Sequence, residues 1–245
     1  MKILFLTLTV LAYYKQGHQF IGELVDSVLV NSSLNTSIKE ISPWADSIRR
    51  KKGYSWVAPL HYIDTRDDSE HNNCNPHIDT LDGNIYTALK NYTARISDKK
   101  TRTLEDLKFF VHFYQDLFQP LHMSGIYRGG NRYKVLFFGR KASLHEVWDY
   151  LILRNRIKER PDYKEYMLDI VNTISSHRPY DIEFWIKHNN KLTCDYVYSG
   201  IQKNEEISEE YYEDTKTVVE ILIAMCVANL KKIIDDLYSS YDKLT

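Results

Sequence analysis

The sequence predicts a mainly α-helical protein, and three observations favour that fold class. Only 9 glycines and 6 prolines punctuate 245 residues, too few for a many-stranded β-sandwich, which needs turn residues every 8 to 12 positions or so. Hydrophobic residues make up 43% of the chain, and a chain of this length can bury one sizeable core. Apolar residues also recur at helical spacing in several long segments. We therefore expect one helical domain over residues 13–245.

The individual elements follow from the same spacing. Residues 104–118 form the clearest helix, because Thr103 can cap the first turn, Asp106 follows three residues later, and Pro120 ends the pattern. Residues 124–143 instead hold a glycine-rich turn and a short apolar run, which predict a short irregular or β-hairpin segment. The polar, acidic stretch 199–208 is expected to be a surface loop. The other predicted helices cover residues 17–29, 38–49, 85–96, 144–157, 162–174 and 209–237.

Residues 1–12 are interpreted as a signal peptide. A lysine at position 2 precedes a ten-residue apolar run that ends at Ala12, the pattern of a short secretory signal. The alternative is a buried strand or the start of a core helix. The run is too short to span a membrane, which takes about 20 apolar residues, and residues 218–230 are read as a core helix for the same reason. We expect a secreted protein, or one in a secretory compartment, that begins at Tyr13 and is a monomer.

An exported chain is compatible with a disulfide. Cys74 and Cys194 can pair in an oxidising compartment, leaving Cys226 as a buried free thiol, although the sequence alone leaves the connectivity open. Three sequons give weak support for export and mark candidate glycosylation sites at Asn31, Asn35 and Asn91.

The charge balance restricts how a nucleic acid can be bound. With 32 Lys+Arg against 33 Asp+Glu, the net charge is -1, so no broad basic surface can hold a polyanion by counterion release alone. A phosphate would have to be held locally.

Two histidine–aspartate pairs point to a metal site. His112 and Asp116, and again His145 and Asp149, are four residues apart within apolar segments, so each pair lies on one helix face. Such pairs are costly to bury unless a cation neutralises them, and imidazole with carboxylate is a usual zinc ligand set. Either pair alone is more simply a salt-bridged surface pair. Two pairs favour metal binding, with His122 following the proline that ends the first helix.

Further candidate ligands lie upstream. Asp46 and His61 are each bracketed by core residues, and Gly17-His18 lies five residues from the proposed cleaved end. The four other histidines lie in polar surroundings and are expected to be bystanders: His71, His77, His177 and His188.

The order of these segments closely resembles the type I nucleases, the secreted zinc-dependent single-strand-specific nucleases and 3'-nucleotidases that share a fold with zinc-dependent phospholipase C. The resemblance is strong over residues 13–149 and weaker beyond. Its motifs are Gly17-His18, Trp44-Ala45-Asp46 with Arg49, Leu60-His61 with Asp64, His112 with Asp116 and Gln119-Pro120-Leu121-His122, Gly129-Gly130-Asn131, and Leu144-His145 with Trp148-Asp149.

The resemblance implies a single helical domain of the phospholipase C/P1 nuclease type and three zinc ions. Asp116 would bridge two ions, and the amine and carbonyl of Tyr13 would bind the third, so this ligand exists only after cleavage. The implied sets are Asp46, His61, His112 and Asp116 for the first zinc, His122, His145 and Asp149 for the second, and Asp116, His18 and Tyr13 for the third. The resemblance also implies a disulfide between Cys74 and Cys194 and glycosylation at Asn91.

The implied activity is hydrolysis of RNA and single-stranded DNA to 5'-mononucleotides. The resemblance also implies removal of phosphate from 3'-nucleotides. We expect Asp64 to orient the attacking water, Arg49 and Asn131 to hold the phosphate or sugar, and Tyr62 to stack on an unpaired base. The alternatives are a solvated charge for Arg49 and ordinary core packing for Tyr62.

Two departures from the family pattern bear on the third ion. Tyr13-Tyr14 replaces Trp-Gly, and Gln115 replaces a glycine, which is expected to place bulk beside the cluster. Two rival functions remain. One is phospholipase C activity on the same scaffold, but Asp149 favours the nuclease because the phospholipases tend to have glutamate at that position. The other is a non-catalytic zinc-binding protein.

Overall fold

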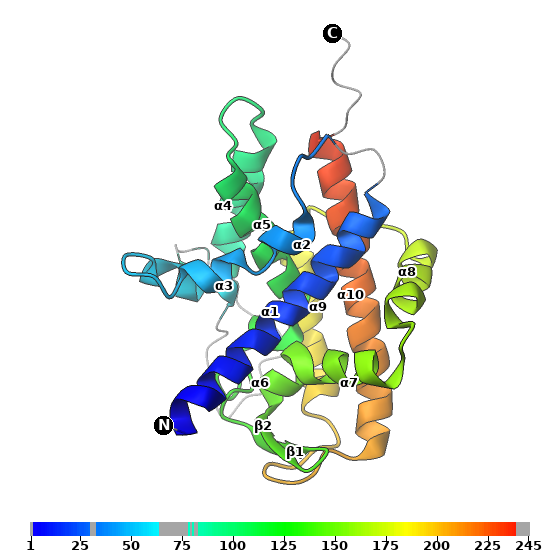
Figure 1. The fold of residues 1–245 in the computed structure, drawn as a ribbon. Helices are drawn as coiled ribbons and strands as arrows, with labels where there is room; N and C mark the ends of the chain where they lie inside the picture. Colours follow the sequence, from blue (N-terminus) through cyan, green and yellow to red (C-terminus); the bar gives the residue numbers. More distant parts are fainter. Residues whose placement is uncertain (1, 30–32, 64–77, 79, 81–82, 239–245) are drawn as a thin grey trace.

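Helices dominate the structure, as the sequence predicts (Figure 1). The computed structural model describes residues 2–29, 33–63, 78, 80 and 83–238, with the backbone alone described for residues 2–14. Within these ranges the strands are β1 (Lys134–Phe137) and β2 (Arg140–Ser143), an antiparallel hairpin that confirms the predicted hairpin segment.

The helices follow one another along most of the chain. The α-helices are α1 (Lys2–Val28), α2 (Ile38–Ile41), α3 (Trp44–Ile48), α4 (Ile85–Ser97), α5 (Leu104–Asp116), α6 (Leu144–Glu146), α7 (Ile152–Glu159), α8 (Tyr163–Thr173), α9 (Ile182–Leu192) and α10 (Glu209–Tyr238). Short helical turns of other geometry are η1 (Ser55–His61), η2 (Pro120–Met123), η3 (Val147–Leu151) and η4 (Thr193–Val197). In the described part of the chain, no helix has the length and apolarity needed to span a membrane.

Helix α5 lies at the centre of the fold. Its residues are buried on every side from Asp106 to Asp116 apart from Lys108, the pattern of a helix enclosed by others. It contacts α4, α3, α2, α1 and α10. The predicted cap is present: Thr103 accepts from the backbone of Asp106, whose carboxylate accepts from the backbone of Thr103. Arg95 of α4 also pairs with Asp106 at 2.5 Å.

Helices α1 and α10 pack against each other, and both contact α5. In Figure 1, α1 crosses the view diagonally and α10 runs from its top toward its bottom. Glycine at position 22 permits a close approach between α1 and α2. A Cβ atom there would lie 2.6 Å from Oγ of Ser42 and 2.7 Å from Cα of Lys39. Only a residue without a side chain lets α2 sit this close, and Ser42 ends α2.

Four predicted helices differ from the observed ones. The predicted helix 17–29 is the second half of α1, which begins at Lys2. The segment 38–49 is two helices, because Pro43 interrupts the backbone hydrogen bonding between α2 and α3. The helix predicted over 104–118 ends at Asp116, and Pro120 begins η2 instead of ending α5. The segment 144–157 is broken by the π-helical turn η3.

Helix α9 was not predicted. Its buried face carries Asn189 and Asn190 alongside Ile182, Trp185 and Ile186, so the apolar periodicity of the sequence stops one turn before the helix does. The expected surface loop 199–208 is confirmed in large part, with one bridge from Glu206 to Leu136.

The structure describes only some of the predicted cleavage, glycosylation and disulfide sites. Helix α1 runs through residues 12 and 13 without a break, and the cleavage after Ala12 stays a prediction. Asn35 and Asn91 are exposed, and Asn31 lies outside the described residues. Cys226 is a buried free thiol, as expected. Cys194 lies in η4, but Cys74 lies outside the described residues, so their pairing also stays a prediction.

The approach of α1 to α2 generates a stability prediction. Gly22→Ala should lower the free energy of unfolding by about 1–3 kcal/mol, the usual cost of overpacking, because the new methyl group meets backbone atoms of Lys39 that cannot turn away. Chemical denaturation of the purified variant measures this. Gly17→Ala is the matched control in the same helix, since its Cβ would lie 3.5 Å from the nearest atom, an ordinary contact. Equal stability of the two variants would contradict the close approach.

Candidate metal centre

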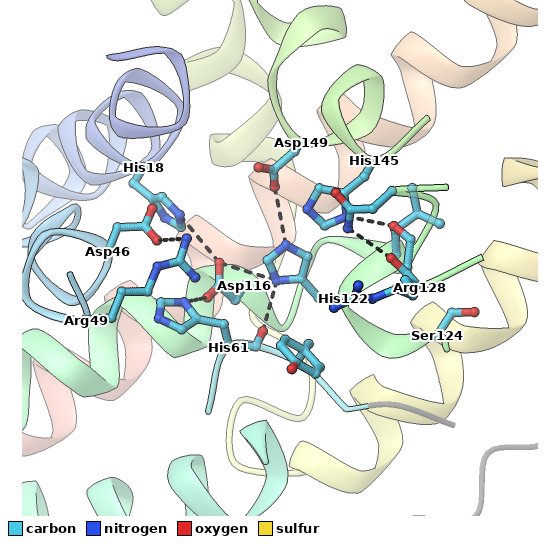
Figure 2. Close-up of a pocket in the computed structure, with 14 residues that line it drawn as sticks. His18, Asp46, Arg49, His61, Asp116, His122, Ser124, Arg128, His145 and Asp149 are labelled. Atoms are coloured by element: carbon cyan, nitrogen blue, oxygen red, sulfur yellow. Dashed lines mark hydrogen bonds and ion pairs between the residues drawn. The ribbon is translucent and has the colours of Figure 1, made fainter. Parts of the chain in front are cut away.

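Eight of the predicted metal ligands converge at one end of α5, and Figure 2 shows all of them except His112. They come from seven different elements of the fold, although the sequence separates the first from the last by more than half of the chain. The eight residues are His18 of α1, Asp46 of α3, His61 of η1, His112 and Asp116 of α5, His122 of η2, His145 of α6 and Asp149 of η3.

The carboxylate of Asp116 is at the middle of this group. Its Oδ2 atom lies 2.8 Å from Nδ1 of His61 and 3.4 Å from Nε2 of His112. Its Oδ1 atom lies 3.4 Å from Nε2 of His18 and 3.5 Å from Nδ1 of His122. Each oxygen therefore faces two histidines, which is the arrangement expected of a bridging carboxylate.

Backbone carbonyls fix the protonation of three histidines. Nδ1 of His112 lies 2.6 Å from the carbonyl oxygen of Ser42, Nδ1 of His122 lies 2.9 Å from that of His61, and Nδ1 of His145 lies 2.7 Å from that of Gly129. Because a carbonyl oxygen only accepts, each Nδ1 donates its hydrogen. In the neutral ring, Nε2 then carries a free lone pair, the form that binds a metal.

The spacing of the donor atoms fits zinc. Ligand atoms placed 2.0–2.1 Å from a tetrahedral zinc ion lie about 3.3 Å apart. Nε2 of His112 lies 3.1 Å from Nδ1 of His61 and 3.4 Å from Oδ2 of Asp116. Two imidazole nitrogens at this distance share one hydrogen or one cation. Within the described part of the chain, Nε2 of His61 is buried and has no hydrogen-bond partner. Nδ1 is therefore the ring nitrogen of His61 that faces Asp116 and His112.

Three groups of donor atoms, two of which share His112, have the compactness that one ion requires. In each group the ligand atoms lie within 4.8 Å of one another. The groups are His18, His112 and Asp116; Asp46, His61 and His112; and His122, His145 and Asp149. The geometry thus brings the predicted side-chain ligands together in three sets, close to the sets implied by the sequence; whether zinc occupies them stays a prediction.

Burial and neighbouring charges set the ionisation of the two carboxylates nearest the centre. Burial opposes a charge on Asp116, but the histidines around it, led by His112 and His122, outweigh burial and hold the pKa of Asp116 far below its ordinary value. The same balance lowers the pKa of Asp46 to about 2, with His112 and Arg49 as the main opposing charges. Both side chains are therefore carboxylates at any physiological pH.

Two of the histidines differ sharply in their ionisation. Burial lowers the pKa of His112 to about 3, so this ring is neutral at physiological pH and is charged only at the low pH where the two carboxylates titrate. Burial also acts on His122, but the carboxylates of Asp116 and Asp149 outweigh it and raise the pKa of His122 to about 9. His122 lies between two negative charges and holds a proton there when no other cation is present. The space between these carboxylates is thus a site for positive charge.

Helix α9 holds the segment that carries His122. Asn189 donates from Nδ2 to the carbonyl oxygen of Leu117 at 2.6 Å, and Asn190 donates to that of Met123 at 2.7 Å. The hydroxyl of Thr193 donates to the carbonyl oxygen of Pro120 at 2.8 Å. These three bonds satisfy carbonyl groups of the residue that follows α5 and of η2, and they fix the path from Asp116 to His122.

Unusual backbone positions the other two candidate ligands of the set that contains His122. Asp149 belongs to the π-helical turn η3, a feature that occurs often at functional sites. His145 is held by a turn at residues 127–130 in which all four φ angles are positive, from 49° to 75°. A Cβ atom on Gly129 would lie 2.6 Å from the carbonyl oxygen of Leu121, so glycine is required for this turn to reach His145.

The centre opens into a cavity of about 280 Å³ (Figure 2). Arg49 lines it and pairs with Asp46 at 2.9 Å, so Arg49 is not simply a solvated charge. Tyr62 lines it with 40% of its surface exposed, so core packing is not its role. Asn131 also lines the cavity and donates to the carbonyl oxygen of Arg128.

Sequence reasoning missed two cavity residues, Ser124 and Arg128. Arg128 directly precedes the Gly129-Gly130 pair, and its position beside this motif is the sequence feature that could have marked it as a site residue. In the described part of the chain no carboxylate pairs with its guanidinium, whereas that of Arg49 is engaged. Figure 2 places the two arginines on opposite sides of the metal ligands.

Some predicted site residues are not placed here. Asp64 lies outside the described residues, and so do the expected bystanders His71 and His77. The other two bystanders, His177 and His188, are exposed and far from the cavity lining, as expected. The backbone at Tyr13 is inside α1, and its role as an amine ligand stays a prediction.

The raised pKa of His122 generates a pH prediction for the metal-free protein. The folded state keeps a proton on His122 up to about pH 9, whereas an unfolded histidine loses it near pH 6.5. This stabilisation is fully present below pH 6.5 and is lost as the pH rises to 9, with a slope of at most about 1.4 kcal/mol per pH unit. Urea denaturation in chelator at pH 7 and pH 8.5 measures it. The slope should be smaller in His122→Gln, and an identical slope would refute the assignment.

The chain is similar to known proteins over most of its length. The S1/P1 nuclease family model matches residues 15–239. Endonuclease 1 of Arabidopsis thaliana is 29% identical over 224 residues, which cover 80% of this chain and 73% of that protein. Nuclease P1 of Penicillium citrinum is 28% identical over 241 residues, covering 86% and 88%. Nuclease S1 of Aspergillus oryzae is 25% identical over 251 residues, covering 85% of each. The chain therefore belongs to the S1/P1 nuclease family.

Proposed function

We propose that this member of the nuclease family is a zinc-dependent endonuclease that hydrolyses RNA and single-stranded DNA to 5'-mononucleotides and removes phosphate from 3'-nucleotides. The observation that carries the proposal is the shared carboxylate of Asp116, which faces four histidines at the floor of an open cavity. A near-neutral chain suits this reading, because the centre rather than a broad basic surface holds the phosphate.

Three zinc ions are proposed, with Asp116 shared between two of them. When bound, such a cluster supplies a hydroxide at neutral pH, positive charge for the phosphoryl oxygens and stabilisation of the leaving oxygen. The first set is Asp46, His61, His112 and Asp116, the second is His122, His145 and Asp149, and the third is Asp116, His18 and the backbone amine and carbonyl of Tyr13.

The cavity residues bind and orient the substrate. Arg49 is held by Asp46 and directs its remaining donors toward a phosphate. Asn131 offers its amide to the phosphate or sugar, and Tyr62, exposed at the cavity, provides a face for an unpaired base. A base within a duplex is already stacked, which favours single strands. Asp64 is proposed to orient the attacking water.

Arg128 adds a second cation at the opposite side of the cavity from Arg49. Arg49 is paired with Asp46 and serves the phosphate at the centre. The guanidinium of Arg128 is then available to a neighbouring phosphate of the same strand. Arg128 thus favours a polynucleotide over a mononucleotide.

The proposed location is extracellular or within the secretory pathway. Residues 1–12 act as the signal, the mature chain begins at Tyr13, and Cys74 pairs with Cys194. Asn91 and Asn35, whose side chains are exposed, and Asn31 are the proposed glycosylation sites. The mature protein is proposed to be a monomer.

The deciding experiment measures mononucleotide release from single-stranded and duplex DNA and from RNA, with and without chelator. We expect hydrolysis of the single strands that chelator abolishes and zinc restores. A parallel assay with phosphatidylcholine separates the phospholipase C alternative. Bound zinc without hydrolysis of any single-stranded substrate or 3'-nucleotide would leave only the non-catalytic zinc-binding alternative.

Asp116→Asn should lose both metal and activity, because one carboxylate serves two ions. We expect fewer bound zinc ions by elemental analysis and a fall in activity of more than about 100-fold, beyond what changes outside the ligand shell usually cost. Glu105→Gln removes the same charge from the exposed first turn of α5 and is the matched control. Near-normal activity of Asp116→Asn would show that the bridging assignment is wrong.

Arg128→Gln should weaken binding of strands selectively. We expect KM for a single-stranded oligonucleotide to rise by roughly 10-fold, as for one lost charged hydrogen bond, and the salt dependence of binding to decrease by about 0.7 in log–log slope. Hydrolysis of a 3'-mononucleotide should be unchanged. Arg132→Gln, an exposed arginine of the same segment that does not line the cavity, is the control. Equal losses on both substrates would place Arg128 at the central phosphate instead.

A further inference from the structure

A chain of hydrogen bonds links the end of α2 to His18. The hydroxyl of Ser42 lies 2.7 Å from the carbonyl oxygen of Ile38. Nε2 of Gln115 lies 2.8 Å from that hydroxyl oxygen, and Oε1 of Gln115 lies 2.7 Å from Nδ1 of His18. Ser42 and Gln115 are buried, at 0% and 3% exposure, so water does not compete for these bonds.

The direction of every bond in this chain follows from its first member. The carbonyl oxygen of Ile38 can only accept, so the hydroxyl of Ser42 donates to it. That hydroxyl oxygen is then left to accept, and the amide nitrogen of Gln115 must be the group that donates. The amide oxygen of Gln115 consequently faces His18, where it accepts from Nδ1. The orientation of the amide is thus fixed by its surroundings.

The consequence for His18 is a single tautomer. With the hydrogen on Nδ1, Nε2 carries a free lone pair, and this atom lies 3.4 Å from Oδ1 of Asp116. The ring of His18 also stacks on that of His112, with centroids 4.0 Å apart. The backbone carbonyl of Ser42 accepts from His112. One serine therefore orients both rings, His112 directly and His18 through Gln115.

We propose that Gln115 is a positioning residue that fixes the tautomer of His18, so that the subsite of His18 and Asp116 is ready to bind a metal ion. The inference rests on the proposed metal centre, and it adds a role that the sequence did not suggest. Gln115 is expected from the sequence to be bulk beside the cluster. Its side chain instead has both ends hydrogen-bonded within the site.

Gln115→Leu is the informative variant, since leucine fills most of the same space and cannot accept a hydrogen bond. In the metal-free protein at a pH where His18 is neutral, long-range proton–nitrogen NMR correlations report which ring nitrogen carries the hydrogen. We expect Nδ1–H in the parent protein and a mixture or Nε2–H in Gln115→Leu. His18→Gln assigns the signals. Gln115→Glu keeps an acceptor facing His18 and should restore the Nδ1–H form.

Zinc titration against a competing chelator gives the second readout. In Gln115→Leu we expect one ion to bind roughly 10- to 100-fold more weakly, the usual loss when a metal-bound histidine loses its outer partner, with the affinity for the other ions retained. Ser42→Ala keeps the carbonyl that holds His112 and removes only the hydroxyl. It should weaken the same ion by a smaller factor, and the double variant should lose less than the product of the two factors.

Three results would overturn the inference. They are an Nε2–H tautomer of His18 in the parent protein, parental affinity for every ion in Gln115→Leu, and equal weakening of every ion by both variants, which would mark a packing role. These outcomes are separate from failure of the proposed function. A parent protein that binds no zinc refutes the metal centre itself, whatever the variants do.

Discussion

The structure depends on placing one ionised carboxylate, Asp116, inside the protein. This side chain is 2% exposed, and burying an isolated charge is prohibitively costly unless it is neutralised and hydrogen-bonded. Four histidines supply that environment, and they come from α1, η1, α5 and η2. The charge on Asp116 is therefore stable only when these four elements are packed together. The proton that His122 holds at this site shows where the deficit of positive charge lies.

The rest of the fold supplies rigidity to the donor atoms. Three histidines are oriented by backbone carbonyls, and a backbone acceptor moves only when its whole element moves. Gly22 brings α2 against α1 so that Ser42 can reach both His112 and Gln115. Helix α9, remote in sequence, fixes the segment between Asp116 and His122. Loss of such an outer contact typically weakens metal binding by roughly 10- to 100-fold.

Much of this arrangement could be predicted from the sequence, and what could not has a physical cause. Periodicity located α4, α5, α8 and α10 because their buried positions are mostly apolar, and α4 and α5 also begin with local capping residues. It missed α9, where buried asparagines Asn189 and Asn190 have partners only in the folded chain. Residue types, spacing and the family resemblance together singled out the eight side chains that the structure brings to one site. The role of Gln115 could not be predicted, because it depends on a serine 73 residues away. Arg128 was missed although it directly precedes Gly129-Gly130, because a neighbouring motif does not tell which way a side chain points.

The proposed amine ligand places one more constraint on α1. An amine and a carbonyl oxygen of the same residue can bind one ion only if both atoms point to the same side, which requires an extended backbone with ψ near 180°. Helical backbone has ψ of about -42°, which turns the carbonyl oxygen away from the amine. Tyr13 lies inside α1, so a mature chain that binds its third ion in this way must leave helical geometry at Tyr13. Only the helix from His18 onward needs to persist, since that part carries the histidine and the glycine that packs on α2. Cleavage would therefore change the conformation of the first residues as well as create the amine, and the two effects act on the same ion.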